Sequence, residues 1–364
     1  MNINTFTYSG AVTELKSIMD KHNVSRLMIV HGRKSYIACG GEDLMRKLTD
    51  THDMTICEFS DFSINPKMED VSKGADSVRM FNPDAIIAIG GGSAMDMAKL
   101  MRYVSKQTKI PLIAIPTTSG TGAETTQFAV CYIDGKKESI DRTDLLPDYA
   151  LLIPELTINN DAYLTACTGF DALAQAIESY WNINTTSESE MYAEEAISYL
   201  SYGLPNLLKK LEQPLTKYEQ REQIMQGAHC AGKAINITRT TAPHAISYVL
   251  TSKYGYPHGH AVALTFPYFF EKNVRCSKDE YAGKDYWAYH TKMQRLVQMM
   301  GWDWNDDLYE KMKQYISDIG LEYDVRRPFE PDIVEDGINI ERAKNNPLKL
   351  TKDIIKEAVA SITK

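Results

Sequence analysis

The sequence predicts an α/β domain with a parallel sheet and helices on both faces, followed by an all-helical domain. Up to Pro154, short apolar runs alternate with amphipathic stretches, the pattern of parallel strands joined by crossover helices. Beyond Pro154 strand signals nearly vanish, and apolar residues recur at helical spacing. We therefore expect one domain over 1–155 and a second over 156–364, with a ligand cleft between them.

The individual elements follow from short apolar runs bounded by turn residues and from helical periodicity. Strands are expected over 25–31, 54–59, 84–89 and 112–115, and helices over 41–51, 68–80 and 93–104. In the second domain we expect helices over 161–180, 187–210, 218–236 and 242–254. The run DAIIAI over 84–89 is the clearest strand, and it leads directly into three glycines.

Composition restricts the class of protein. The length of 364 residues allows two domains with their own cores. A formal net charge of −8 argues against a nucleic-acid-binding face. The N-terminus lacks the features of a signal peptide, and no apolar run reaches the ~18 residues of a membrane span, so we expect a cytoplasmic protein. The six cysteines form no CxxC pair and are expected to be reduced.

The strand over 84–89 ends in Gly90-Gly91-Gly92-Ser93 and enters a helix. Glycines let backbone amides approach phosphate oxygens closely, and the helix N-terminus favours the same negative charge. Asp96, in the first turn, could accept hydrogen bonds from a ribose or a nicotinamide. The alternative is a strand–helix turn in which glycine serves only the bend.

A second strand exit favours the cofactor interpretation. The strand over 112–115 runs into PTTSGTGAE, which contains Thr117, Thr118 and Thr121. Two such exits at neighbouring carboxyl ends of a parallel sheet form the kind of crevice in which dinucleotides bind. The pattern is not the GxGxxG fingerprint, so an ordinary Rossmann assignment would be wrong in detail.

The first strand ends in a sequence that bears on the choice of cofactor. An acidic residue at this point would favour a free ribose 2′-hydroxyl, but the chain has Gly32. Arg33, Lys34 and Ser35 follow and could bind a 2′-phosphate, which favours NADP(H) over NAD(H). A solvated basic turn is the alternative.

A metal site is predicted in the second domain. Asp171 and Gln175 are four residues apart and project from one face of a helix. His244 and His258 follow, with His260 two residues later. One carboxylate and two imidazoles are a plausible ligand set for a divalent ion such as Fe or Zn, although each residue taken alone is more often structural.

Taken together, these motifs resemble the iron-containing (group III) alcohol dehydrogenase family. GGGSAMDMAK, PTTSGTGAE, TGFDALAQAIE and the histidines of PHAISY and PHGHAV occur in the family's order and spacing across essentially the whole chain. The resemblance implies an NAD(P)-dependent oxidoreductase, with a homodimer as the default assembly. The cofactor-contacting positions that it implies are Gly91, Gly92, Ser93, Asp96, Thr117, Thr118, Thr121 and Lys137.

The resemblance also implies the metal ligands Asp171, His244, His258 and the residue at position 175, where the family usually has histidine. Gln175 offers only a neutral amide oxygen, a weaker ligand, so water or His260 could complete the site. The family also usually has a histidine linked with proton transfer where this chain has Tyr248. Tyr248 or water would then supply the proton, and His260 is a second candidate catalytic residue.

Arg239, Thr240 and Thr241 precede the first metal histidine and could form a pocket for an anion. The alternative is a surface arginine with two helix-capping threonines. ALAQAIESYW and INITRTTAPHAISY resemble the hydroxyethylphosphonate dehydrogenase branch of the family, which implies reduction of phosphonoacetaldehyde. Three other readings stay open: a generic primary-alcohol dehydrogenase, a metal- and NAD-dependent lyase of the dehydroquinate-synthase type, and a non-catalytic nucleotide-binding protein.

Overall fold

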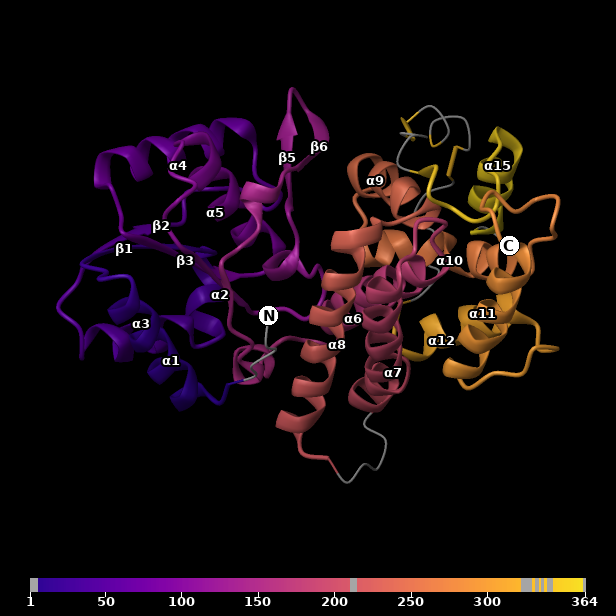
Figure 1. Cartoon of the computed structure of the whole chain (residues 1–364), viewed down its shortest axis with the longest axis horizontal. Helices are drawn as coiled ribbons and strands as arrows, with labels where there is room; N and C mark the ends of the chain where they lie inside the picture. Colours follow the sequence, from indigo (N-terminus) through magenta and orange to yellow (C-terminus); the bar gives the residue numbers. More distant parts are fainter. Residues whose placement is uncertain are drawn as a thin grey trace. The chain divides into compact units, whose positions relative to one another are not determined.

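The computed structural model describes residues 6–209, 215–321, 329–330, 334, 337–338 and 343–362. The chain divides into two compact units (Figure 1). The first extends to Asn160 and includes Leu215–Gln226, and the second comprises Asp161–Pro214 and the chain from Gly227 onwards. The sequence prediction placed the division near residue 155 and did not foresee the contribution of 215–226 to the first unit.

The first unit is built on a parallel five-stranded sheet in the order β2-β1-β3-β4-β7. Its strands are β1 (Arg26–His31), β2 (Thr55–Phe59), β3 (Ala85–Gly90), β4 (Leu112–Pro116) and β7 (Tyr149–Ala150). Every residue of β3 and β4 is buried, which explains why these strands appear in the sequence as continuous apolar runs.

Helices cover both faces of this sheet, as the sequence predicted. One apolar cluster joins alternate strand residues such as Leu27 and Ile87 to the first three helices. The other joins Met28 and Ile86 to the next two. The helices are α1 (Tyr8–Lys21), α2 (Arg33–Ala38), α3 (Gly41–Thr49), α4 (Met68–Phe81) and α5 (Gly92–Val104). The predicted doubly covered parallel sheet is therefore confirmed.

An antiparallel hairpin of β5 (Phe128–Ile133) and β6 (Lys136–Asp141) lies between β4 and β7 in the chain (Figure 1). Its two-residue turn is Asp134-Gly135, and both residues have a positive φ. Asp-Gly is the sequence that such a turn favours, so the hairpin could have been predicted from this dipeptide. Three short 3-10 helices connect this region: η1 (Ala123–Thr125), η2 (Thr143–Leu145) and η3 (Pro154–Thr157).

The second unit is helical throughout its described residues, apart from an isolated bridge between Tyr281 and Leu348. Its central helix α6 begins after the N-cap Asp161 and is buried along nearly its whole length, packing against α7 and α10. The helices are α6 (Ala162–Trp181), α7 (Ser187–Lys209), α9 (Ala242–Tyr254), α10 (His258–Val274), α11 (Tyr286–Met299), α12 (Leu308–Asp318), α15 (Lys352–Ser361) and the part of α8 (Lys217–Thr238) from Gly227 onwards.

Two expectations from composition can be compared with the structure. All six cysteines lie in the described residues and are free thiols. Among the described helices, none has an apolar stretch long enough to cross a lipid bilayer.

Candidate metal centre and glycine edge

The loops that follow β1, β3 and β4 lie at one edge of the sheet, because these three parallel strands are neighbours. We call this the glycine edge, and it consists of Gly32, Gly91–Ser93 and Thr117–Thr121. Two of its loops lie against each other. A Cβ atom at Gly91 would be 3.2 Å from Thr118 Oγ1, and one at Gly92 would be 3.1 Å from Thr121 Cγ2. The structure thus brings together residues that the sequence assigned to two separate motifs.

Helix α5 begins at this edge with Gly91 as its N-cap, and no described side chain caps it. Its first backbone amides therefore have no side-chain acceptor, which suits an anion such as a pyrophosphate. Ser93 Oγ accepts a hydrogen bond from the backbone N–H of Asn65 at 3.1 Å, so this hydroxyl also holds a neighbouring loop.

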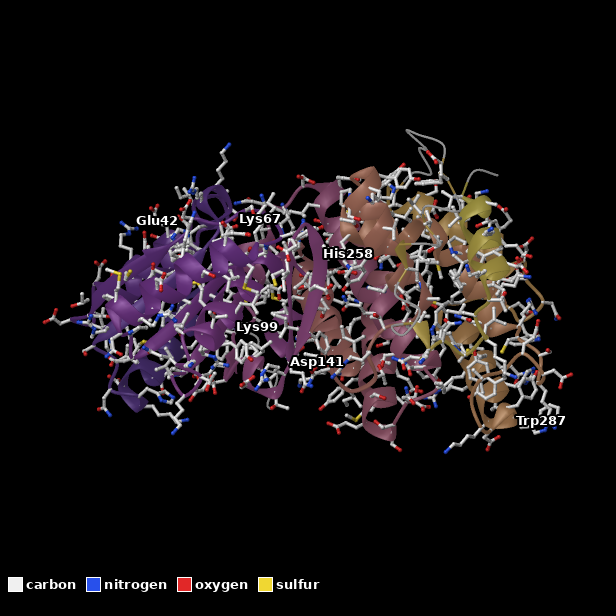
Figure 2. The ribbon with its side chains drawn as sticks, turned by 90° about the horizontal axis from the view of Figure 1, so that it is seen from above. Glu42, Lys67, Lys99, Asp141, His258 and Trp287 are labelled. Carbon is white, nitrogen blue, oxygen red and sulfur yellow. The ribbon has the colours of Figure 1, made fainter. Side chains whose placement is uncertain are left out.

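A half-buried acid, Asp96, and a buried lysine, Lys99, lie on α5, the helix that begins at the glycine edge. Burial raises the pKa of Asp96 to about 6, against the opposing charges of Lys99 and Lys137. Lys137 lies on β6, opposite Tyr132. The Lys99 ammonium donates to the backbone oxygens of Thr126 and Phe128 at 2.8 and 2.9 Å (Lys99 is labelled in Figure 2). Burial lowers the pKa of Lys99 to about 8.

The residues after β1 that were predicted to bind a 2′-phosphate are Arg33, Lys34 and Ser35. The Arg33 guanidinium pairs with Asp61 at 2.5 Å, and both side chains are about two-thirds exposed. Ser35 Oγ lies 2.5 Å from the position that a Cβ of Gly32 would take. Lys34 is exposed. Arg33 is therefore held by an acid from the neighbouring loop rather than left without a partner.

The predicted metal ligands of the second unit converge. One ligand atom each from Asp171, His244 and His258 lies within 4.8 Å of the others. Asp171 Oδ1 is 3.0 Å from His244 Nε2 and 3.8 Å from His258 Nε2. The three residues come from α6, α9 and the first position of α10 (His258 is labelled in Figure 2). A carboxylate and two imidazoles at this spacing form a first shell for one divalent ion.

Gln175 lies one turn beyond Asp171 on α6 and is 4% exposed. Its Oε1 atom is buried and has no hydrogen-bond partner among the described residues. A buried acceptor without a partner is costly, and a metal ion would satisfy it. This orphaned oxygen, together with the three converging donors, shows that the residues present fit a divalent cation.

The side chain of Glu178 organises the metal centre, although the sequence prediction did not include it. Its fully buried carboxylate accepts hydrogen bonds from His244 Nδ1 and from the backbone N–H and hydroxyl of Thr241, the residue before α9. Trp181 Nε1 in turn donates to Thr241 Oγ1 at 3.0 Å. The ionised carboxylate of Glu178 can only accept hydrogen bonds, so His244 Nδ1 must carry the proton of this bond. His244 then directs Nε2 towards Asp171.

The charges around His244 change its pKa. Burial lowers its pKa, but attraction to Glu178 and hydrogen bonds to both carboxylates outweigh this and raise the pKa to about 10. Asp171 and Glu178 thus favour a positive charge between them. A divalent ion would take the place of the proton on Nε2 and meet the same negative environment.

Gly259, between the two histidines of PHGHAV, lets α10 approach α6. A Cβ atom here would lie well under 3.0 Å from the backbone oxygen of Cys167 and 3.1 Å from Asp171 Cβ. Real Cβ atoms essentially never come so close to backbone. The absence of a side chain at this position therefore sets the distance between His258 and Asp171.

Tyr248 and His260, the two predicted catalytic residues, have different neighbours. Tyr248 packs edge-on against His258, with ring centres 5.9 Å apart. His260 does not belong to the cluster of donors found in the described part of the chain. Its Nδ1 lies 2.8 Å from the hydroxyl of Tyr163, a residue that is 44% exposed.

Arg239 has a left-handed backbone conformation, with φ of 68°, directly after α8. Its guanidinium donates to the backbone oxygen of Asn236, and its own backbone oxygen accepts from Asn182 Nδ2 at 3.2 Å. A non-glycine residue at positive φ is strained, and such strain is often found at functional sites. Thr240 follows and is half-buried.

One signal in the sequence could have revealed Glu178. It follows Asp171 by seven residues and Gln175 by three, so all three lie on one face of α6. A buried helix whose single polar stripe carries two acids and an amide is unusual, because such groups are rarely buried without partners. The role of Thr241 could not be predicted in this way, because it depends on how α9 packs against α6.

Comparison with known proteins agrees with this arrangement of a parallel α/β unit and a helical, metal-binding unit. The family description "Iron-containing alcohol dehydrogenase" matches residues 4–154, and "Fe-containing alcohol dehydrogenase family, C-terminal" matches residues 165–362. The chain therefore belongs to the iron-containing alcohol dehydrogenase family, whose members are NAD(P)-dependent oxidoreductases with a divalent metal site. The lyase and the non-catalytic readings of the sequence are set aside.

Individual relatives cover most of the chain. It is 32% identical over 300 residues to a 1-propanol dehydrogenase of Citrobacter freundii, covering 78% of this chain and 75% of that protein. An NAD-dependent methanol dehydrogenase of Bacillus methanolicus is 27% identical, with 75% of each chain covered. A solved sulfoacetaldehyde reductase from Bifidobacterium kashiwanohense, in complex with NAD⁺, superposes with a TM-score of 0.83 at 26% identity. It covers 100% of this chain and 99% of that one.

Proposed function

We propose that this dehydrogenase reduces a small anionic aldehyde with NADPH, and that the substrate is phosphonoacetaldehyde, converted to 2-hydroxyethylphosphonate. The observation that carries the catalytic part is the convergence of Asp171, His244 and His258 beside the orphaned oxygen of Gln175. Support for the substrate class comes from the full-length similarity to a sulfoacetaldehyde reductase, whose substrate is a two-carbon aldehyde with an anionic group.

Each residue of the metal centre would have its own role. Asp171, His244 and His258 would hold the ion, with the Gln175 oxygen as a fourth ligand. When bound, the ion acts as a Lewis acid that polarises a carbonyl oxygen. Glu178 fixes the orientation of His244 and adds a second buried negative charge, which compensates for the neutral ligand at position 175.

The proton that completes alcohol formation is assigned to Tyr248. The support for this role is that its ring packs edge-on against His258, one of the three metal donors. The pair of Tyr163 and His260 provides a second hydrogen-bonded route for a proton from a partly exposed hydroxyl. Comparing the pH dependence of kcat in Tyr248→Phe and His260→Gln variants would show which of the two groups is used.

The preference for NADPH is supported by the end of β1. Gly32 offers no carboxylate to a ribose 2′-hydroxyl, and Arg33, Lys34 and Ser35 surround it. Asp61 pairs with the exposed Arg33 guanidinium, whose other N–H groups remain donors that a 2′-phosphate could accept from. A kcat/KM that is at least about tenfold higher with NADPH than with NADH is expected, and Arg33→Ala should lower this ratio. A preference for NADH would contradict the assignment.

We assign the anion of the substrate to Arg239, which lies between α8 and α9, the helix that carries His244. We expect kcat/KM for phosphonoacetaldehyde to exceed that for butyraldehyde at least about tenfold, and Arg239→Gln to remove the difference. Because the guanidinium also binds the end of α8, the thermal midpoint of this variant should be measured in parallel. Equal rates on the two aldehydes in the wild-type enzyme would refute the anionic substrate.

The second candidate function is that of a general primary-alcohol dehydrogenase, favoured by the 32% identity to a 1-propanol dehydrogenase. This alternative predicts that turnover follows the apolar size of the aldehyde and that Arg239→Gln has no effect on selectivity. The same pair of aldehydes therefore separates the two candidates.

A further inference from the structure

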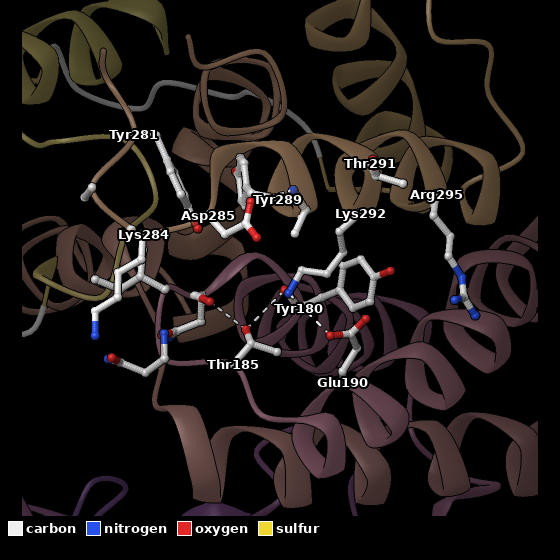
Figure 3. Close-up of a pocket in the computed structure, with 16 residues that line it drawn as sticks. Tyr180, Thr185, Glu190, Tyr281, Lys284, Asp285, Tyr289, Thr291, Lys292 and Arg295 are labelled. Atoms are coloured by element: carbon white, nitrogen blue, oxygen red, sulfur yellow. Dashed lines mark hydrogen bonds and ion pairs between the residues drawn. The ribbon is translucent and has the colours of Figure 1, made fainter. Parts of the chain in front are cut away.

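The second unit contains a pocket of about 800 Å³ that shares no residue with the metal cluster (Figure 3). It is lined by the end of α6, by residues 182–185, by Glu190 of α7, and by residues 281–295 in and before α11. This volume lies within the range of small-molecule sites. Its walls combine tyrosine rings with charged side chains, so its chemistry points to a polar ligand with a flat apolar part.

Lys292 is the enclosed charge of this pocket, since its side chain is only 16% exposed. Its ammonium lies 3.6 Å from Glu190 Oε2, farther than a hydrogen bond, and 5.0 Å from the centre of the Tyr180 ring (Figure 3). Burial lowers the pKa of Lys292, against the attraction of Glu190. An ammonium with three donors and one distant carboxylate retains the capacity to bind a further acceptor.

The neighbouring charges do not supply that acceptor. Glu194 is engaged elsewhere, because it accepts from Arg295 at 2.6 Å and from the Tyr180 hydroxyl at 3.2 Å. Asp285 is the N-cap of α11 and accepts from the backbone N–H of Ala288 at 3.1 Å. Three cationic and two anionic side chains line the pocket, and Glu194 balances the charge of Arg295. The five charged side chains of the lining are Lys284, Lys292, Arg295, Glu190 and Asp285.

Tyr281 and Tyr289 form the flat wall of the pocket, with rings stacked at a centroid distance of 4.5 Å. Tyr289 is fixed by its hydroxyl, which donates to the backbone oxygen of Asn273 at 2.7 Å. Gly283 leaves room for Tyr281, whose hydroxyl lies where a Cβ would be. A rigid aromatic wall beside a half-buried cation is suited to an aromatic or otherwise planar anion.

We propose that this pocket is a second binding site, for a small planar carboxylate whose charged group binds Lys292. The ring of the ligand would lie against Tyr281. Tyr180, which lines the pocket, is followed by Trp181 and Asn182, which donate to Thr241 and to the backbone oxygen of Arg239. An occupant would therefore touch the same end of α6 that supports the metal centre, although the two sites share no lining residue.

The proposal is tested by calorimetric titration of the metal-loaded enzyme with benzoate, with benzamide as the neutral analogue. We expect benzoate to bind with a dissociation constant below about 1 mM and benzamide to bind at least about tenfold more weakly. Lys292→Gln should weaken benzoate at least about tenfold. Lys311→Gln is the matched control, because it removes an exposed lysine that pairs with Asp306 outside the pocket and should leave benzoate binding unchanged.

Two further variants separate this pocket from other sites. Ala288 is exposed on α11 and lines the pocket, so Ala288→Tyr should fill the pocket and abolish benzoate binding without disturbing the fold. Asp171→Asn alters the metal centre and should leave benzoate binding as it is. The proposal is overturned by the absence of saturable binding, by equal affinity for benzoate and benzamide, or by loss of binding in Asp171→Asn with retention in Ala288→Tyr.

Discussion

The glycine edge and the metal centre differ in what they are made of. The glycine edge is made mainly of backbone amides and small hydroxyl side chains at the ends of neighbouring strands, and each of its loops is one continuous motif. The metal centre is made of charged and imidazole side chains from three helices, backed by the buried Glu178. We therefore expect the edge to be disturbed by added atoms, and the metal centre by a change of one charge.

This difference has a physical origin. Many backbone amides share the binding of a phosphate, so no single side chain dominates. A metal ion in a buried site depends on a few strong ligands, and an uncompensated charge there is costly. The following substitutions test this comparison, from the largest expected effect to the smallest.

Asp171→Asn should have the largest effect. It removes the only carboxylate of the donor cluster found in the described residues, and leaves His244 facing a neutral amide. We expect the affinity for the divalent ion to fall more than about 100-fold and turnover to be lost with it. Metal content after dialysis against a chelator would measure this. Glu310→Gln, an exposed acid on α12, is the control, and an equal loss there would mean that the effect is only electrostatic at long range.

Glu178→Gln tests whether a charge outside the donor cluster affects the affinity for the metal ion. The amide can still accept one hydrogen bond, but the second negative charge is lost and His244 is less firmly oriented. We expect metal affinity to fall about 10- to 100-fold, with the fold retained, as circular dichroism would show. Unchanged metal affinity would mean that Glu178 serves only to anchor Thr241.

Gly259→Ala tests packing in the metal centre. The added Cβ would strike the Cys167 backbone and force α10 away from α6, at a cost of about 2 kcal/mol. Both the thermal midpoint and the metal content should fall, because His258 moves with the helix. Gly255→Ala is the matched control: nothing lies within 4 Å of its Cβ, but its φ is 76°, so only stability should fall, by about 1 kcal/mol. Equal metal content in both variants would refute the positioning role.

Gln175→His tests whether the residue at position 175 is the fourth ligand of the metal ion. An imidazole is a better ligand than an amide oxygen for Fe²⁺ or Zn²⁺, so we expect metal affinity to rise about tenfold. Competition with a chromophoric chelator would measure the change. A lower affinity would show that the orphaned oxygen is itself required by this site.

Asp96→Asn should have the smallest effect, and its sign depends on pH. The folded-state pKa of about 6 lies above the usual 3.8, so the folded protein binds this proton more tightly than the unfolded chain does. Stability therefore decreases as the pH rises from about 4 to about 6. The variant should lose this dependence and be about 1 to 2 kcal/mol more stable at pH 7, as urea denaturation at several pH values would show. If the variant is less stable at pH 7, the attraction between Asp96 and Lys99 stabilises the folded protein by more than the burial of Asp96 costs.

Much of the fold could be predicted from the sequence because local patterns dictate it. Fully buried parallel strands must be continuous apolar runs, and β1, β3 and β4 begin and end within about a residue of their predicted bounds. In the first unit, α1, α2, β7 and the Asp134-Gly135 hairpin were not predicted; the hairpin has a short turn signal and strands that are only half-buried. The three converging donors of the metal centre were also predicted, from residue type and from the family resemblance.

Periodicity and residue chemistry were enough to predict the main strands and many of the helices, the glycine motifs and the identity of Asp171, His244 and His258. The other features depend on how the elements pack. The buried carboxylate of Glu178 acquires its role from the packing of α9 against α6, and Gly259 from the packing of α10. The pairing of Arg33 with Asp61 likewise joins loops that follow two neighbouring strands. Contacts between residues far apart in the chain leave no local pattern, because they exist only once the elements have packed.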